Sequence, residues 1–198
     1  MTRDGRREVI ERASLQLFAA HGYAGTPMDQ IARATGVSAP VLYDHFDSKL
    51  DLHRRLLERT RDELLEMWRT HLAGDRPAAE RVAHAIDGWA RYVQANPYAA
   101  RMFFRETTGE PEAAAIHRRI QAESQVSLGE ILGDEQAGDP VGLEMAATVM
   151  RSGLTGLAVW WLDHPEVTRE QIVATAMNVI WVGFERAIAG ERWPPGAP

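Results

Sequence analysis

The chain has 198 residues, of which 45% are hydrophobic and 25% charged, and it contains no cysteine. This composition is typical of a folded globular protein, so it excludes dominant disorder, disulfides, thiolate metal sites and cysteine nucleophiles. Lysine and arginine number 22 against 28 aspartate and glutamate, a formal net charge of −6. The acidic excess follows residue 61, because residues 1–61 carry ten basic and eight acidic side chains. The N-terminal part can therefore present a phosphate-binding face.

Targeting and membrane signals are not visible in the sequence. Residues 1–12 are rich in arginine and glutamate and lack an apolar core, which predicts no secretory signal peptide. The longest stretches without a charged residue, 152–162 and 171–184, are shorter than a typical membrane span. We therefore expect a cytoplasmic protein with no membrane partner.

Helix-start signals divide the chain into segments whose apolar residues recur at helical spacing. Thr26, Ser48 and Thr168 are each followed three residues later by an acidic residue or glutamine, the spacing of a capping box. No segment alternates apolar and polar residues for long enough to predict a strand. The sequence therefore predicts an all-α fold. The predicted helices are 6–21, 27–34, 39–45, 48–72, 77–95, 97–107, 111–132, 140–162 and 168–189.

The second and third predicted helices are short and are separated by Gly36, the arrangement of a helix-turn-helix motif. Ile31 and Ala32 are expected to face inward on the first of them, and Leu42 and Phe46 on the second. The exposed face of the second helix is then formed by Ala39, Pro40, Val41, Tyr43 and His45.

A longer pattern of about 50 residues surrounds this motif. It consists of Leu17, Phe18, Gly22, Tyr23, Thr26, Ile31, Ala32, Gly36, Val37, Ser38, Leu42, Tyr43, His45, Phe46, Ser48 and Lys49. The pattern resembles the DNA-binding domain of the tetracycline-repressor (TetR) family. The resemblance implies a homodimeric transcriptional regulator, usually a repressor that a small ligand releases from a palindromic double-stranded operator.

The resemblance also implies a domain organisation and two sets of DNA contacts. We expect a DNA-binding domain at 1–50, a ligand-binding and dimerisation domain at 51–190, and a disordered Pro/Gly-rich tail at 191–198. The implied phosphate contacts are Thr26, Tyr43, His45 and Lys49. At the recognition helix, Ser38 is expected as the cap and as a DNA-binding residue, and the residues facing base edges are Ala39, Pro40 and Val41. These last three lack hydrogen-bonding side chains, so they can offer only apolar contacts, for example to thymine methyl groups.

The last two predicted helices contain the charge-free stretches 152–162 and 171–184. A helix that is apolar on every face must be buried on every face. Burial against a second copy of the chain is the simplest solution, and a monomeric core with both helices at its centre is the alternative. The predicted interface residues are Gly153, Gly156, Trp161, Val173, Met177, Val179 and Phe184.

Aromatic and methionine side chains accumulate in the C-terminal two thirds of the chain. Most of them are expected in the core, since large apolar side chains normally pack there. The family resemblance favours a pocket for a small apolar or aromatic effector among these helices. The candidate lining residues are Trp89, Tyr92, Phe103, Phe104, Met150 and Trp160.

Enzyme motifs are missing from the sequence. None of the seven histidines has an acidic residue three positions before it, so the Glu-x-x-His ligands of a di-iron bundle are excluded. The chain also lacks H-E-x-x-H, a phosphate-binding glycine loop and G-x-S-x-G. We therefore predict no enzyme activity, no metal and no cofactor. The alternative to a DNA-binding regulator is a helical module that binds a small molecule and whose DNA role is lost or secondary.

Overall fold

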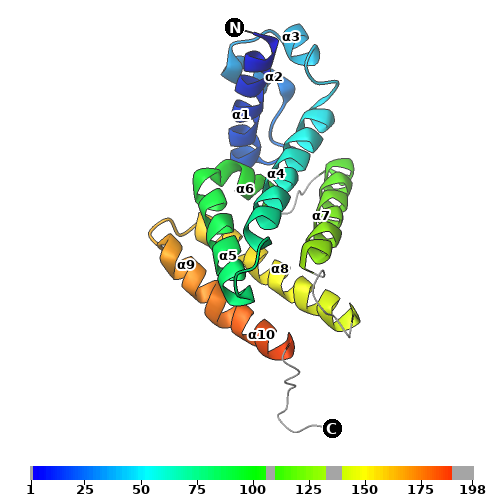
Figure 1. The fold of residues 1–198 in the computed structure, drawn as a ribbon. Helices are drawn as coiled ribbons and strands as arrows, with labels where there is room; N and C mark the ends of the chain where they lie inside the picture. The colour runs from blue at the N-terminus through cyan, green and yellow to red at the C-terminus, as the bar shows by residue number, and fades with distance from the viewer. Residues whose placement is uncertain (1, 106–109, 133–139, 189–198) are drawn as a thin grey trace. The chain divides into compact units, whose positions relative to one another are not determined.

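The computed structural model describes residues 2–105, 110–132 and 140–188. Within these residues every regular element is a helix, as Figure 1 shows, which confirms the predicted all-α class. The elements are α1 (Arg3–His21), α2 (Met28–Thr35), α3 (Ala39–Tyr43), α4 (Lys49–Leu72), α5 (Ala78–Ala95), α6 (Pro97–Phe104), α7 (Pro111–Leu132), α8 (Pro140–Leu162), α9 (Arg169–Ala176), η1 (Met177–Trp181) and α10 (Val182–Ile188).

Most predicted helix bounds lie within three residues of the observed ones, and the last predicted helix differs in kind. The segment predicted as one helix at 168–189 is divided among α9, the π-helical segment η1 and α10. A π-helical turn is wider than an α-helical one, and such turns are rare inside helices. The apolar pattern of the sequence does not distinguish the two. The predicted tail, 191–198, lies outside the described residues.

Two of the three sites with capping-box spacing have a side-chain cap. Thr168 and Gln171 make a reciprocal capping box at α9, in which each side chain accepts a hydrogen bond from the backbone N–H of the other. At α4 the Ser48 hydroxyl accepts a hydrogen bond from the Asp51 N–H at 3.0 Å. Such caps satisfy N–H groups that have no partner within the helix.

The chain forms two compact units. The first contains residues 1–63 and 96–123, and the second contains 64–95 and 124–198. The predicted DNA-binding domain, 1–50, lies within the first unit, and its boundary at residue 50 stays a prediction. In the first unit α1 packs against α2 and α6, and α2 packs against α3. The core there includes Ile10, Phe18, Ile31, Leu42, Phe46, Leu52, Leu56 and Leu57.

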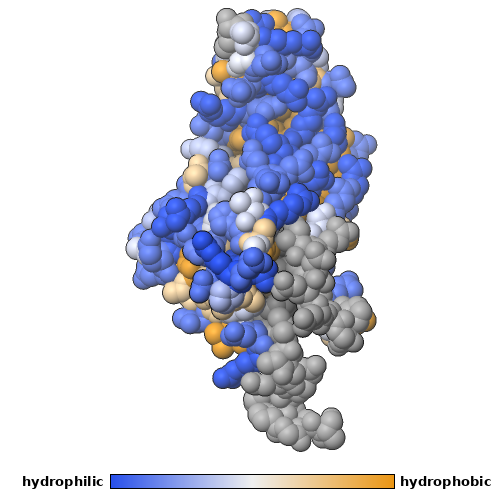
Figure 2. All heavy atoms as spheres, in the orientation of Figure 1, coloured by the Kyte–Doolittle hydropathy of each residue, from blue (hydrophilic) through white to orange (hydrophobic). Residues whose placement is uncertain are grey.

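In the second unit α5 packs against α9 and η1, and α8 packs against α5, α9 and η1. Its core includes Ile86, Trp89, Val93, Met150, Leu154, Trp161, Ile172 and Trp181. In the view of Figure 2, hydrophobic residues reach the surface beside α9 and α10. Among the described residues, no helix combines the length and hydropathy that a membrane span requires.

Candidate nucleic-acid interface

The turn between α2 and α3 has the geometry of a helix-turn-helix motif. Gly36 adopts a left-handed backbone with φ 67°, a conformation that glycine tolerates better than other residues. The Val37 N–H donates to the Ala32 carbonyl at 3.2 Å, which closes the end of α2. Leu42 and Phe46 are fully buried, as the sequence predicted. These contacts hold α3 against α2 by one face only.

The opposite face of α3 is open to solvent. Pro40 is exposed, Tyr43 is 51% exposed, and Ala39 and Val41 are half-buried. Ser38 is the N-cap residue, but its side chain makes no capping hydrogen bond, so the predicted hydroxyl cap is wrong. The α3 helix therefore presents a small apolar surface, formed by Ala39, Pro40 and Val41, beside the exposed phenol of Tyr43.

Thr26 has a different role from the predicted one. Its side chain is fully buried, and its hydroxyl lies 2.8 Å from the Gly22 carbonyl and 3.2 Å from the Leu17 carbonyl. The N-cap residue of α2 is Pro27, which provides no side-chain cap. A phosphate contact through the Thr26 hydroxyl is not available in this conformation, and the predicted cap is wrong. The residue instead ties the turn after α1 to the end of that helix.

Lys49, at the first position of α4, is held by the turn between α1 and α2. Its Nζ donates to the Tyr23 carbonyl at 3.0 Å and lies 4.1 Å from the centre of the Tyr23 ring. The side chain is half-buried, and so is that of His45, in the turn after α3. The phosphate contacts predicted for Tyr43, His45 and Lys49 are compatible with their exposure and stay proposals.

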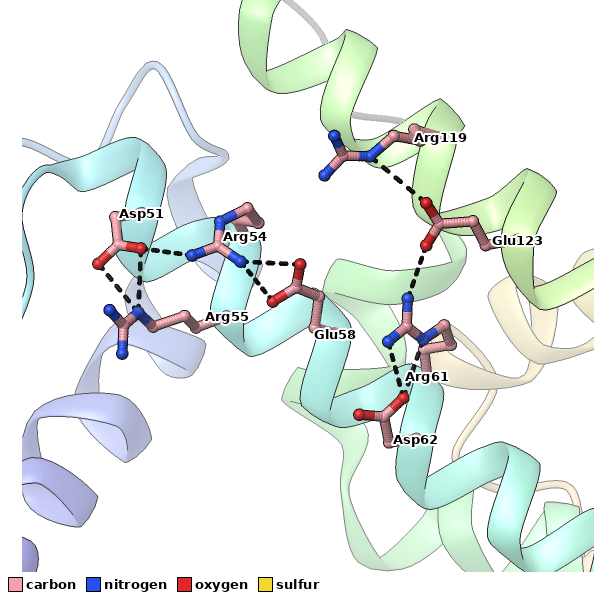
Figure 3. A network of polar contacts seen from close by, with 8 residues as sticks. All are labelled: Asp51, Arg54, Arg55, Glu58, Arg61, Asp62, Arg119 and Glu123. Atoms are coloured by element: carbon pink, nitrogen blue, oxygen red, sulfur yellow. Dashed lines mark hydrogen bonds and ion pairs between the residues drawn. The ribbon is translucent and has the colours of Figure 1, made fainter.

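The first turns of α4 carry a network of ion pairs, shown in Figure 3. The Asp51 carboxylate accepts from Arg54 at 2.7 Å and from Arg55 at 2.9 Å, and Arg54 also pairs with Glu58 at 2.7 Å. Burial alone would raise the pKa of Asp51, but the hydrogen bonds from Arg55 and Arg54 outweigh burial and lower it. Both guanidinium groups are therefore engaged within the protein. Lys49 differs from these arginines, because its ammonium faces the Tyr23 ring and not a carboxylate.

A second, separate group of ion pairs connects α4 to α7 within the first unit. Arg61 donates to Glu123 at 2.7 Å, and Arg119 lies 3.6 Å from the other oxygen of that carboxylate (Figure 3). Exposed pairs of this kind contribute at most about 1 kcal/mol each. Their contribution to the stability of the fold is therefore small.

His53, one turn after Lys49, lies in an aromatic cluster that the sequence pattern did not reveal. Its ring meets Phe18 and Tyr23 edge to face, with centroids 5.2 Å and 4.9 Å apart. Burial, followed by the charges of His117 and Lys49, lowers the pKa of His53 to about 4. The imidazole is therefore neutral at physiological pH. Helical spacing predicted an inward position for this residue, but it carried no information on the rings that surround it.

The predicted interface residues fall into four groups. Gly153, Gly156 and Val179 are exposed, and Val179 reaches 74%. Val173 and Met177 are half-buried. The side chain of Phe184 lies outside the described residues.

The prediction that Trp161 lies at the interface is wrong. It is buried, and its Nε1 donates to the Val167 carbonyl at 2.8 Å. The indole therefore packs inside its own unit.

The exposed face of α8 is longer than the sequence predicted. Besides the two glycines, it carries four large apolar side chains that are between 46% and 67% exposed. These residues are Val141, Met145, Val149 and Trp160. They recur at intervals of about one or more helical turns, so they form a continuous stripe on one side of the helix.

The predicted pocket residues are divided between the two units. Trp89 and Met150 are buried and Tyr92 is half-buried in the second unit. Phe103 and Phe104 belong to the first unit, where their rings meet edge to face 5.3 Å apart.

The prediction that Trp160 lines the pocket is wrong, because its side chain is 46% exposed and its ring stacks on His164. Within the part of the chain that the structure describes, no group of acidic or histidine side chains could hold a metal ion.

A helix-turn-helix whose second helix is buried on one face and open on the other defines a class of DNA-binding proteins. Residues 10–56 match the family model for bacterial regulatory proteins of the tetR family. The transcriptional activator FasR of Mycolicibacterium smegmatis is 27% identical over 191 residues, which cover 93% of this chain and 85% of FasR. Residues 10–56 therefore carry a domain of the tetR family of bacterial regulatory proteins, and most of the chain is similar to a transcriptional regulator.

Solved structures share the fold. A TetR-like regulator of Rhodococcus sp. RHA1 is 18% identical and has a TM-score of 0.76, with 96% of this chain and 99% of the other covered. FadR of Bacillus subtilis, solved with stearoyl-CoA, is 18% identical and has a TM-score of 0.71, with 89% and 96% covered. At this identity the likeness concerns the fold alone.

Proposed function

We propose that the protein is a ligand-released repressor that binds a palindromic operator in the cytoplasm as a homodimer. The observation that carries this proposal is the placement of α3, with Leu42 and Phe46 fully buried and Pro40 and Tyr43 turned to solvent. A helix held in this way can enter the major groove, and a dimer reads two half-sites separated by about one helical turn of DNA.

The base contacts we propose are apolar. Ala39, Pro40 and Val41 can meet thymine methyl groups, but they cannot form the bidentate hydrogen bonds that read guanine or adenine. Tyr43, His45 and Lys49 bind phosphates, which fix the register of the protein on the duplex. One of the three ammonium donors of Lys49 is used by the Tyr23 carbonyl, so two remain for phosphate oxygens.

The homodimer is supported by the apolar stripe on α8, defined by Val141, Met145, Val149 and Trp160, together with exposed Val179. Monomeric proteins rarely leave such a continuous apolar surface in water. An isologous contact, in which the stripe of one copy meets that of the other, covers it without a different partner.

Sedimentation tests the dimer. The wild-type protein should show twice the 22.1 kDa monomer mass at micromolar concentration. Val149→Glu should lower this mass, because a dimer would bury two uncompensated carboxylates. Val126→Glu is the matched control, since Val126 on α7 is 63% exposed and lies outside the stripe. A monomeric wild type would contradict the proposal.

The effector we propose is a small apolar or aromatic molecule that binds in the second unit near Trp89 and Met150. The support is that buried aromatic and methionine side chains line such sites, and that FadR of Bacillus subtilis was solved with stearoyl-CoA. Stearoyl-CoA is therefore the first probe. Its addition should raise the thermal unfolding temperature and weaken DNA binding, whereas free coenzyme A should do neither.

Binding to DNA and the sign of regulation need separate measurements. Selection from genomic fragments should yield a palindromic site, and Tyr43→Ala should weaken binding to it. The lack of any binding would favour a helical ligand-binding module without a DNA role. In cells, deletion of the gene should raise transcription from the selected promoter. A fall in transcription would indicate an activator, as FasR is named.

A further inference from the structure

We propose that Tyr23 is a positioning residue for DNA binding, because its ring and its carbonyl hold the Lys49 ammonium in place before DNA arrives. The inference rests on the proposed function, since it takes Lys49 as a phosphate ligand. Tyr23 lies in the turn after α1, 26 residues from Lys49, and is not itself placed among the phosphate or base contacts.

Two contacts from one residue define the position of the ammonium. Nζ donates to the Tyr23 carbonyl at 3.0 Å, and it lies 4.1 Å from the centre of the ring. A lysine ammonium above a tyrosine face is attracted by the negative face of the ring. The carbonyl satisfies one donor, and the two others can bind phosphate oxygens without breaking either contact.

The Tyr23 ring is itself held from two sides. It stacks against Phe18 with an interplanar angle of 14° and a centroid distance of 6.0 Å, and His53 meets it at 72° and 4.9 Å. Both neighbours are nearly fully buried. Burial, followed by the negative charges of Glu110 and Glu112, raises the pKa of Tyr23. The ring is therefore neutral at physiological pH and cannot turn away from Lys49 without disturbing the core.

A lysine side chain that is already ordered binds a phosphate more tightly than a mobile one. A long side chain loses rotamer freedom when it contacts a phosphate, and a side chain that is already ordered loses less. Tyr23→Leu removes the ring and keeps a smaller apolar side chain. Since a dimer contains two such sites, we expect about tenfold weaker operator binding, from about threefold at each site. Tyr23→Phe keeps the ring face and should bind like the wild type.

The first measurement uses the fact that Lys49 is the only lysine in the chain. Lysine-selective isotope labelling therefore gives the side-chain signals of one residue in an NMR spectrum, with no assignment between lysines needed. In the free wild-type protein the methylene protons beside the ammonium should be shifted upfield by the Tyr23 ring. The shift should persist in Tyr23→Phe and vanish in Tyr23→Leu. A wild-type signal at the position of a free lysine would overturn the proposal, even if the variants failed to fold.

The second measurement is a double-mutant cycle on operator affinity. Lys49→Met removes the charge and keeps the stem, and should weaken binding by itself. In the Lys49→Met background, Tyr23→Leu should cause no further loss, because Tyr23 acts through Lys49. An equal loss in both backgrounds would mean that Tyr23 only supports the fold, and the proposal would be wrong. Tyr23→Met, with a larger apolar side chain, repeats the test if Tyr23→Leu unfolds.

The outcomes separate the two proposals. If the wild type binds no DNA, the proposed function fails, and this inference fails with it. If the wild type binds and Lys49→Met has no effect, DNA binding stands, but Lys49 is not a phosphate ligand and needs no positioning. If Lys49→Met weakens binding and Tyr23→Leu does not, only the inference is overturned.

Discussion

Replacement of His53 by leucine should remove a large part of the acid sensitivity of the fold. The imidazole is 2% exposed, and its Nδ1 has no hydrogen-bond partner among the described residues. Burial, and then the charges of His117 and Lys49, lower the pKa of His53 from 6.5 to about 4. Between these pH values the unfolded chain binds a proton at this site and the folded chain does not. The contribution of neutral His53 to the free energy of unfolding is therefore fully present above pH 6.5 and is lost as the pH decreases towards 4.

The size of this effect follows from the pKa difference. At about 1.4 kcal/mol for each pH unit, the full contribution is about 3 kcal/mol, and about 2 kcal/mol of it is lost between pH 7 and pH 5. Urea unfolding of the wild type and of His53→Leu at several pH values measures it directly. His84→Leu, at an exposed position of α5, is the control for removal of a histidine. If His53→Leu and the wild type lose stability in parallel from pH 7 to pH 5, the reasoning is refuted.

Three further changes test separate parts of the DNA-binding unit. Lys49→Met should reduce the slope of log affinity against log salt by about one unit per monomer in fluorescence anisotropy, and an unchanged slope would remove Lys49 from the phosphate contacts. Thr26→Val should cost about 1–2 kcal/mol in urea unfolding, because the hydroxyl that bonds the Gly22 carbonyl is lost. It should leave the salt slope unaltered, and a reduced slope would restore Thr26 as a phosphate ligand. Gly36→Ala should lower the free energy of unfolding by about 1 kcal/mol, because Gly36 has a left-handed backbone that alanine adopts less readily. An unaltered free energy of unfolding would contradict the left-handed conformation at this position.

The helix-turn-helix could be predicted because its determinants are close together in the sequence. Gly36 marks the turn, and Leu42 and Phe46 are one helical turn apart, so their common burial follows from spacing alone. The capping box of Thr168 and Gln171 is equally local. Such features depend on the backbone conformation of a few neighbouring residues, and tertiary packing seldom reverses them.

Thr26 shows where local spacing is insufficient. It stands three residues before an acidic residue, as a capping threonine would, and an exposed hydroxyl there would also suit a phosphate. The hydroxyl turns inward because the carbonyls of Gly22 and Leu17 are within reach in the folded turn. The Lys49–Tyr23 contact is not local either, and no spacing rule predicts a contact across 26 residues.

The adjacent residues Trp160 and Trp161 show a different failure. The prediction assigned the first to a pocket and the second to an interface, whereas the structure exposes Trp160 and buries Trp161. A helix usually reveals its inner face through the polar residues of its outer face. The stretch 152–162 has no charged residue to mark the outer side, so its sequence leaves the rotation of α8 about its axis undetermined. Contacts with α5 and α9 decide that rotation. They leave the stripe of Val141, Met145, Val149 and Trp160 uncovered in the single chain, and the dimer we propose covers it.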